Sequence, residues 1–234
     1  MKMENRKGIS HIEIILSFVI FAGFLIFLLA IFNPFRSYNP SSVYLNILER
    51  GIINNISSKV DFFTLRLNKN IPNCFYFSYD MGLKNVSAKD KDYNKVEAKS
   101  ILAGDKKQIT VNGVGDFYYI YGYEGFEEDN INQVCKELKK VDDYTIGLSR
   151  TYDMVSFTKL LAFQERYNSD YTGLKKELET TQDFSFNVKD SLGNVSLSVT
   201  KNVPKTNVFS MNAPIQIVYN NGSFKYAILN IQTW

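Results

Sequence analysis

The first clear pattern in the chain is an unbroken apolar run near the N-terminus, from Ile9 to Phe32. From Ile14 to Phe32 there is no charged residue, and Ser17 is the only clearly polar side chain. At about 1.5 Å per residue, a helix of this length crosses the roughly 30 Å hydrocarbon layer of a bilayer. The pattern therefore predicts a transmembrane helix over 9–32, followed by a longer part that is polar enough to be soluble.

Three later stretches have hydrophobic residues at three- and four-residue steps, the spacing of one helix face. The first follows Ser41-Ser42, and serine is a good N-cap residue. The second is short, with Val134 and Leu138 expected to face inward. The third contains the polar tripeptide 168–170, a candidate break between two helices. The predicted helices cover 43–58, 131–140 and 156–178.

The remaining regular stretches are rich in β-branched and aromatic residues and are bounded by turn-forming residues, as strands usually are. The predicted strands cover 60–67, 74–79, 107–111, 116–123, 184–189, 195–200, 215–219 and 224–231. Asn112-Gly113 and Asn221-Gly222 are dipeptides typical of two-residue hairpin turns. Alternation around the second predicts a half-buried terminal hairpin, with Ile215, Ile217 and Tyr219 repeating on one strand and Phe224, Tyr226 and Ile228 on the other.

Together these elements predict an α+β protein: an N-terminal transmembrane helix, then one extracellular domain with a mainly antiparallel β-sheet and a few helices. The expected order is a leader over 1–8, the membrane helix over 9–32, a hinge over 33–41 and a head domain over 42–234. Pro34 and Pro40 define the hinge, because a proline disfavours helix at the residue before it.

Composition excludes much chemistry. His11 is the only histidine, so sites that need histidine are excluded from the predicted head. The sequence has no phosphate-binding P-loop and no dinucleotide fingerprint. We therefore expect no enzyme activity, cofactor or metal site, although the many carboxylates leave an exported hydrolase as a minor alternative. A net charge of +3 is too small to indicate nucleic acid as a partner.

The charges beside the apolar run predict its orientation. The leader carries Lys2, Arg6 and Lys7 against Glu4, and only Arg36 lies close on the other side. Because Lys and Arg are retained in the cytoplasm, the N-terminus is expected inside and the C-terminal domain outside the cell. The run is too long for an ordinary secretory signal and lacks a small-x-small cleavage site after it.

Glu13 interrupts the start of the apolar run, where a carboxylate is costly unless it has a partner or lies near the interface, so it is a functional hypothesis by default. The plain alternative is that Glu13, with His11, only marks the boundary with the lipid headgroups. If Gly8 ends a leader, the mature chain starts at Ile9 and Glu13 becomes its fifth residue. A short basic leader ending in Gly, then Glu at the fifth mature position of an apolar helix, resembles the type IV prepilin (class III) signal. The Ile-, Lys-, Asn- and Tyr-rich composition is similar to that of archaeal pilin-like surface proteins.

This resemblance implies that a prepilin-type peptidase cleaves between Gly8 and Ile9. It also implies that the membrane helix then packs against other pilin-like subunits in a surface filament or pseudopilus. Glu13 would pair with the Ile9 ammonium of a neighbouring subunit, a pairing that is strong only in low dielectric. The bulky head favours a minor pilin or pseudopilin. The alternative is an uncleaved, membrane-anchored extracellular domain that binds a carbohydrate or another ligand, favoured by the prolines of the hinge.

Two further sets of residues follow from the predicted exterior location. An oxidising exterior favours a disulfide between Cys74 and Cys135, with two buried free thiols as the alternative. N-x-S/T sequons are candidate glycosylation sites in an exported protein. They occur at Asn55, Asn85, Asn194 and Asn221.

The densest aromatic stretch of the chain is 117–126. Aromatic residues are ordinary strand formers, so the preferred interpretation is a strand buried on both faces. The alternative is a stacking platform for sugars. The acidic triplet 127–129 that follows lacks the ordered ligand pattern of a calcium loop and is interpreted as a solvated loop.

Overall fold

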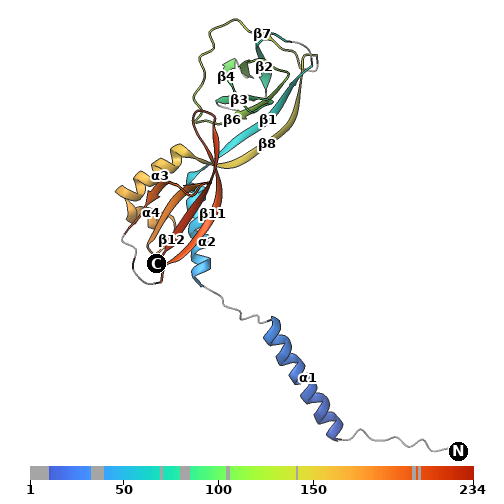
Figure 1. Cartoon of the computed structure of the whole chain (residues 1–234), viewed down its shortest axis with the longest axis vertical. Helices are drawn as coiled ribbons and strands as arrows, with labels where there is room; N and C mark the ends of the chain where they lie inside the picture. The colour runs from blue at the N-terminus through green and yellow to red at the C-terminus, as the bar shows by residue number, and fades with distance from the viewer. Residues whose placement is uncertain are drawn as a thin grey trace, which may run out of the picture. The chain divides into compact units, whose positions relative to one another are not determined.

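The computed structural model describes residues 11–32, 40–68, 71–79, 85–103, 106–140, 142–201, 204 and 207–234 (Figure 1). The chain divides into two compact units, Met1–Pro40 and Ser41–Trp234. The predicted leader and residues 33–39 of the predicted hinge lie outside the described residues. Residues 40 and 41, which belong to the predicted hinge, lie in the first turn of a helix that begins at Pro40.

Helix α1 (His11–Phe32) occupies the predicted apolar run. No described side chain of α1 is buried, and Ile12, Phe18 and Ile26 are each more than 65% exposed. The helix is long and apolar enough to cross a membrane. A helix that is hydrophobic all round requires an apolar environment outside itself, because water would otherwise contact every face.

Helix α2 (Pro40–Ile56) confirms the first predicted helix of the head. Pro40 opens it, at a position where the missing N–H of proline has no helical partner to lose. Its buried stripe consists of Leu45, Leu48, Ile52 and Ile56, at three- and four-residue steps. The chain then passes from Ile56 directly into the first strand without a loop.

The head contains long antiparallel strands. Its described strands are β1 (Ser57–Leu67), β2 (Cys74–Tyr79), β3 (Val86–Asp90), β4 (Lys95–Ala103), β5 (Lys106–Asn112), β6 (Phe117–Gly122), β7 (Lys136–Glu137), β8 (Tyr144–Ser156), β9 (Phe184–Asp190), β10 (Val195–Val199), β11 (Phe209–Val218) and β12 (Phe224–Thr233). Their hydrogen-bonded order is β10-β9-β12-β11-β8-β1-β6-β3-β4-β5-β2-β7. Among these neighbours only β11–β8 and β2–β7 are parallel, so the predicted mainly antiparallel sheet is confirmed.

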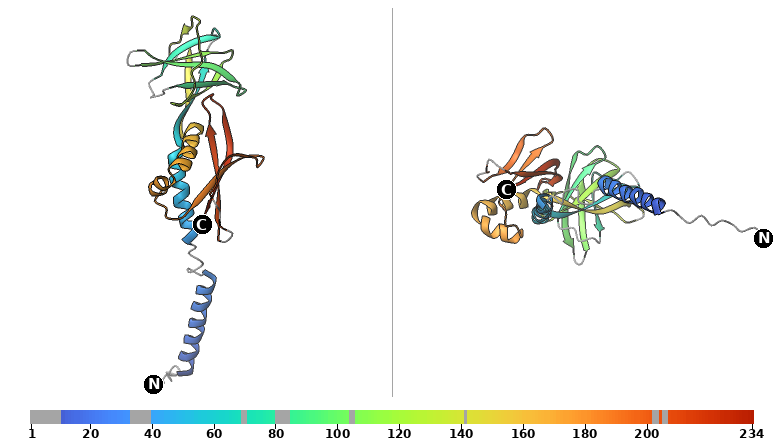
Figure 2. Two further views of the ribbon diagram at one scale, coloured as in Figure 1. Left: turned by 90° about the vertical axis from the view of Figure 1, so that its left-hand side faces the viewer. Right: turned by 90° about the horizontal axis from the view of Figure 1, so that it is seen from below.

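The first of two large cores lies between helices and sheet. Helices α2, α3 (Phe157–Ser169) and α4 (Tyr171–Glu177) cover one face of β10-β9-β12-β11 (Figures 1 and 2). Leu160 and Leu174 from these helices share the core with Phe184 and Leu229 from the strands.

The predicted helix over 156–178 is confirmed, and it is split within the predicted tripeptide. The Ser156 hydroxyl accepts the Lys159 N–H and caps α3, while the Asp170 carboxylate accepts the Gly173 N–H at 2.9 Å and caps α4. Each cap satisfies a backbone donor that has no partner in the first turn.

The second core is the interior of a β-sandwich. One layer is β8-β1-β6-β3, and the other is β4-β5-β2-β7 (Figure 2). Aromatic rings join the layers: the centroids of Phe63 and Phe77 are 6.3 Å apart, and those of Phe75 and Tyr118 are 5.5 Å apart. Such tilted and edge-on pairs are preferred over face-to-face stacking.

Strands β1 and β8 connect the two cores, since they pair along nearly their whole length. In contrast, β8 joins β11 through only two register pairs, Val155 with Ile217 and Ser156 with Val218. A third, small cluster that includes Met154 and Phe126 fills the junction there. The sheet is therefore nearly divided between β8 and β11.

The hairpin predicted at Asn112-Gly113 is wrong. β5 pairs with β4 and β2, whereas β6 pairs with β1 and β3, so the chain crosses between the sandwich layers at this point. The Tyr118 hydroxyl donates to the Gly113 carbonyl at 2.9 Å, and a Cβ at Gly113 would collide with the Val96 side chain. Close approach, not a two-residue turn, explains this glycine.

The helix predicted over 131–140 is also wrong. The segment contains the short strand β7, which pairs with the edge strand β2. Leu138 faces inward as predicted, but Val134 is fully exposed. Only two residues supported the helical spacing, and pairing with β2 outweighs so weak a preference. Strands β3, β4 and β8 were not predicted, and the middle of β8 is exposed without apolar alternation.

The terminal hairpin around Asn221-Gly222 is confirmed, with Gly222 at a φ of 80°. One of its faces was predicted incorrectly. The register sets Ile215 opposite Ala227 and Gln216 opposite Tyr226. The buried face of β12 is therefore Ala227, Leu229 and Ile231, while Tyr226 and Ile228 point outward. Turn length fixes this register, and a one-residue difference exchanges the two faces.

Candidate functional site

Of the N-terminal candidates, the structure describes only Glu13. Gly8 and Ile9, the predicted processing site, lie outside the described residues. Glu13 lies in the first turn of α1, where the helix dipole favours a negative charge. Ile12 and Ile14 on either side of it are more than half exposed. The carboxylate thus stands at the end of an apolar surface that needs a covering partner.

The two cysteines are brought together as predicted. The sulfur atoms of Cys74 and Cys135 lie at disulfide-bonding distance, with their Cα atoms 4.7 Å apart. The pair fastens the start of β2 to the segment immediately before β7. A link that closes a loop of 61 residues stabilises the fold by roughly 4 kcal/mol in the chain-entropy model.

The four sequons differ in how their side chains are used. The amide nitrogens of Asn55, Asn85 and Asn194 donate hydrogen bonds of 2.7–3.0 Å to acceptors of the head. Asn221 is exposed in the hairpin turn, and its side-chain oxygen accepts the Ser223 N–H at 3.0 Å. Among the four, Asn221 is therefore the best-placed glycan acceptor, because the other three support the local fold.

The aromatic stretch does not form a strand buried on both faces. Tyr118 and Ile120 are fully buried in the sandwich, but Phe117, Tyr119 and Tyr121 point to the other side and remain partly exposed. The preferred interpretation of the sequence is thus wrong for one face of β6. The strand is aromatic on both sides because one side builds the core and the other builds a surface.

That surface, here called the aromatic face, extends over neighbouring strands. Phe62 of β1 lies opposite Tyr121 in the register, and their ring centroids are 5.2 Å apart. Tyr119 stacks on Tyr93 at 4.5 Å. The aromatic face consists of Phe62, Tyr93, Phe117, Tyr119, Tyr121 and Tyr152.

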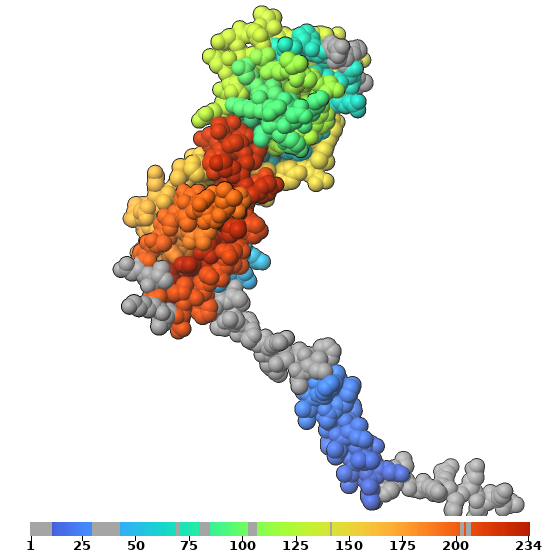
Figure 3. Space-filling view, viewed as in Figure 1, coloured from blue at the N-terminus to red at the C-terminus, as the bar shows by residue number. Residues whose placement is uncertain are grey.

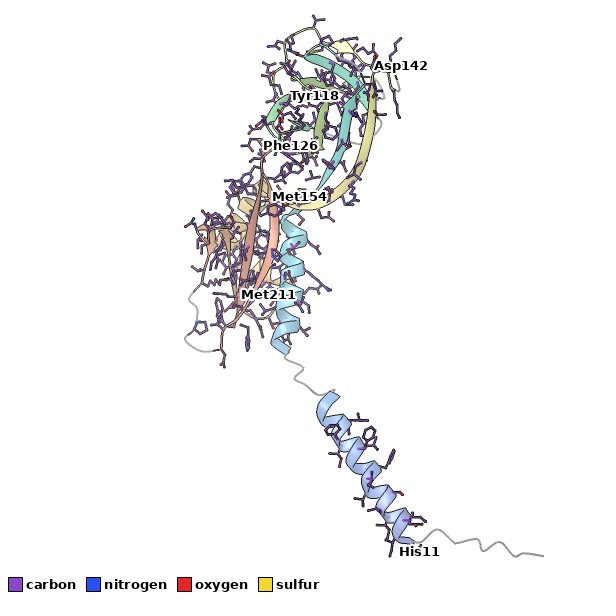
Figure 4. The ribbon with its side chains drawn as sticks, turned by 45° about the vertical axis from the view of Figure 1, so that its right-hand side comes forward. His11, Tyr118, Phe126, Asp142, Met154 and Met211 are labelled. Atoms are coloured by element: carbon purple, nitrogen blue, oxygen red, sulfur yellow. A yellow bond between two sulfur atoms is a disulfide. The ribbon has the colours of Figure 1, made fainter. Side chains whose placement is uncertain are left out.

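A cavity of about 250 Å³ opens at one end of the aromatic face, where β11 leaves β8. Met154 lies at this junction and is only 6% exposed (Figure 4). In the space-filling view the hairpin of β11 and β12 abuts the sandwich at this level (Figure 3). The cavity is lined by Phe62, Tyr121, Tyr152, Met154, Gln216 and Tyr226.

The lining contains no carboxylate, ammonium or guanidinium group. Burial raises the pKa of Tyr121 to about 12, so its hydroxyl keeps its proton at neutral pH. A cation lies beside the lining but is not part of it: Lys89 Nζ is 4.9 Å from the Phe224 centroid and 5.9 Å from that of Tyr121. Burial lowers the pKa of Lys89. The cavity is therefore amphipathic and uncharged.

A second cavity, of about 410 Å³, is lined by polar residues of α4 and by Lys201. Within it, Lys175 Nζ donates to the Asp183 carboxylate at 3.0 Å, and this hydrogen bond lowers the pKa of Asp183. Lys201 Nζ lies 3.5 Å from the Tyr171 centroid. These contacts hold α4 and the following loop onto β9, which makes the cluster a structural one.

Sequence reasoning missed most of the cavity residues. Phe62, Tyr152, Gln216 and Tyr226 come from four strands, and only the topology brings them to Tyr121. One signal was available. Adjacent aromatic residues at 62 and 63 place one ring on each face of β1, so a ring had to point away from the core.

The acidic triplet 127–129 lies in a loop with Glu127 and Glu128 exposed, as predicted, and two of its carboxylates also contact the neighbouring strand β4. The Asp129 carboxylate accepts the Ala98 N–H and pairs with Lys95 at 3.0 Å, and Ser100 donates to Glu128. Among the described residues, no group of three or more His, Cys, Asp or Glu side chains could hold a metal ion.

Neither the aromatic cavity nor the N-terminal helix can be assigned by similarity to a known protein. Comparison of the chain with models of protein families, with curated proteins and with solved structures finds no match. Its function therefore has to be argued from the geometry and chemistry of its own residues.

Proposed function

We propose that the protein is a type IV pilin-like subunit, a minor pilin or pseudopilin, that is cleaved after Gly8 and assembles through α1. The observation that carries this proposal is the place of Glu13. It lies in the first turn of a helix that is apolar on all sides, five residues after the proposed cleavage point. A carboxylate within an apolar membrane helix is a functional hypothesis by default, because it is costly unless it is paired or lies near the interface.

The physical argument concerns what covers α1. In the precursor, lipid covers the helix and the basic leader holds the N-terminus at the cytoplasmic face. Cleavage removes Lys2, Arg6 and Lys7 and creates an ammonium on Ile9. In a bundle of such helices, that ammonium and the Glu13 carboxylate of a neighbour neutralise each other. Removing either partner leaves a charge in an apolar environment, so the pair sets the register of packing.

The head supports the same proposal. The buried apolar stripe on α2 is already used by the sheet of the head, whereas the described apolar side chains of α1 are not buried and can serve assembly. The paired cysteines agree with a head exported to an oxidising exterior.

The first test is intact mass measurement and N-terminal sequencing of the protein from native membranes without reductant. We expect a mature chain that begins at Ile9 and lacks the two hydrogens of the free thiols. A chain that still begins at Met1 would contradict the proposal and leave an anchored extracellular domain.

The second test is Glu13→Ala. We expect this variant to be cleaved and to fold normally, but to be absent from filaments, because the neighbour's ammonium loses its partner. His11→Ala, two residues earlier in the same exposed first turn, is the matched control and should be incorporated. Normal incorporation of Glu13→Ala into filaments would contradict the proposed role of Glu13 in assembly.

A further inference from the structure

The cavity beside the aromatic face has no part in the proposed assembly through α1, so its own chemistry must be explained. It combines ring surfaces with hydroxyl and amide groups. Tyr152 is 36% exposed and Tyr226 is 74% exposed, while Met154 closes the floor. Large exposed aromatic side chains around a concave site are unfavourable in water unless something covers them.

We propose that this cavity binds one ring of a neutral carbohydrate. The C–H groups on one face of a pyranose are weakly positive and pack against the negative face of an aromatic ring. The hydroxyl groups at the edge of the sugar need donors and acceptors. The hydroxyls of Tyr152 and Tyr226 and the amide of Gln216 supply them at the same site.

The rings of Phe62, Tyr121 and Tyr152 are held by contacts with one another and with Phe224 before any ligand arrives, whereas Tyr226 projects into solvent. Tyr121 packs between Phe62 and Phe224, with ring centroids 5.2 Å and 4.6 Å away. The Tyr152 ring lies 6.2 Å from Phe62. All four residues project from strands rather than from loops. Little side-chain entropy is therefore lost on binding, which favours even a weak ligand.

The absence of charge from the lining selects the kind of ligand. A phosphate or a carboxylate would lose its hydration and gain no opposite charge from these six residues. Lys89 Nζ lies over the Phe224 and Tyr121 rings, and Arg150 lies opposite Phe62 on the neighbouring strand, but neither residue belongs to the lining. A neutral polyhydroxy ring loses the least on entry.

The size of the site argues against a protein as the occupant. A stable protein interface covers roughly 800 Å² on each partner. The cavity is about 250 Å³ and has a single strongly projecting side chain, Tyr226, at its rim. This matches one end of a glycan better than a flat partner surface.

The test uses the purified full chain in a detergent without a sugar headgroup. Saturation-transfer NMR is recorded with mannotriose, cellotriose and chitotriose as neutral probes and trigalacturonic acid as the acidic probe. We expect transfer to the ring C–H protons of at least one neutral probe. No transfer to any neutral probe, or transfer to the acidic probe alone, would overturn the proposal.

Matched variants locate the binding. Tyr226→Ala and Tyr152→Ala are each expected to weaken binding by about tenfold, since each removes one stacking ring. Tyr226→Phe should retain most of it. Tyr93→Ala removes an exposed ring of the aromatic face outside the cavity and should leave binding unchanged. Equal loss in Tyr93→Ala, or no loss in Tyr226→Ala, would contradict the site. Leader cleavage is measured separately by intact mass, so the pilin-like proposal and the carbohydrate-binding proposal can each fail without the other.

Discussion

Helices α1 and α2 are separated by a short segment of the chain, yet they differ in how much of their apolar surface is buried. In α1 the apolar residues surround the helix, and none of the described side chains is buried. In α2 the buried apolar residues form one stripe that is covered by the sheet and by α3 and α4, while Val43, Tyr44 and Ile47 remain exposed. The distribution of apolar residues around a helix, more than their number, therefore decides whether its partner lies inside or outside the folded chain.

The largest expected effect compares one isoleucine from each helix. Ile52→Ala should destabilise the head by about 2–5 kcal/mol, because Ile52 is completely buried and truncation leaves a cavity. Ile20→Ala should leave the unfolding of the head unchanged, because Ile20 is 64% exposed in α1. Urea unfolding of the full chain in detergent, followed by the fluorescence of Trp234, measures both. Similar decreases in the urea midpoints of the two variants would contradict the proposed difference between α1 and α2.

A smaller effect is expected from the two helical glycines. A Cβ on Gly51 would lie 2.9 Å from Cδ2 of the buried Leu178, whereas a Cβ on Gly23 has nothing within 4 Å. Gly51→Val should therefore destabilise the head by about 1–3 kcal/mol through overpacking. Gly23→Val should leave the head unaffected. The same unfolding experiment reads both, and a neutral Gly51→Val would mean that α2 lies less tightly against α4 than described.

The smallest effect concerns charge at α4. The hydrogen bond from Lys175 lowers the pKa of Asp183 in the folded state. Its contribution to stability is therefore present above the unfolded pKa, near 3.9, and is lost as the pH falls through the lower folded pKa. Asp183→Asn should reduce the difference in Tm between pH 7 and pH 3. Lys175→Met should do the same, and combining the two should add nothing further. An additive double variant would show that the pair does not act as a unit.

Local sequence patterns were sufficient to predict the elements whose structure depends on residues within the same segment. The stripe on α2, the break at Asp170 and the Asn221-Gly222 turn were all predicted, because caps, periodicity and turn residues are encoded within a few positions. The apolar character of α1 was equally clear.

Local sequence patterns failed for segments whose structure depends on pairing with a distant strand. Cys135 and the strand β7 are set by β2, some sixty residues earlier, so the weak helical spacing there was misleading. β8 could not be recognised because its central residues are exposed and it is stabilised by pairing with β1. The cavity combines Phe62 with Tyr226, and only the strand order brings these two residues to one place.

The direct passage from α2 into β1 has a mechanical consequence. Because no loop lies between Ile56 and Ser57, a pull applied to the chain at Pro40 passes from α2 directly into β1. The ten paired positions of β1 and β8 then connect that load to the sandwich. Phe62 and Tyr152 belong to these same two strands. A load taken up at Pro40 would thus reach the cavity through β1 and β8 without passing through a loop.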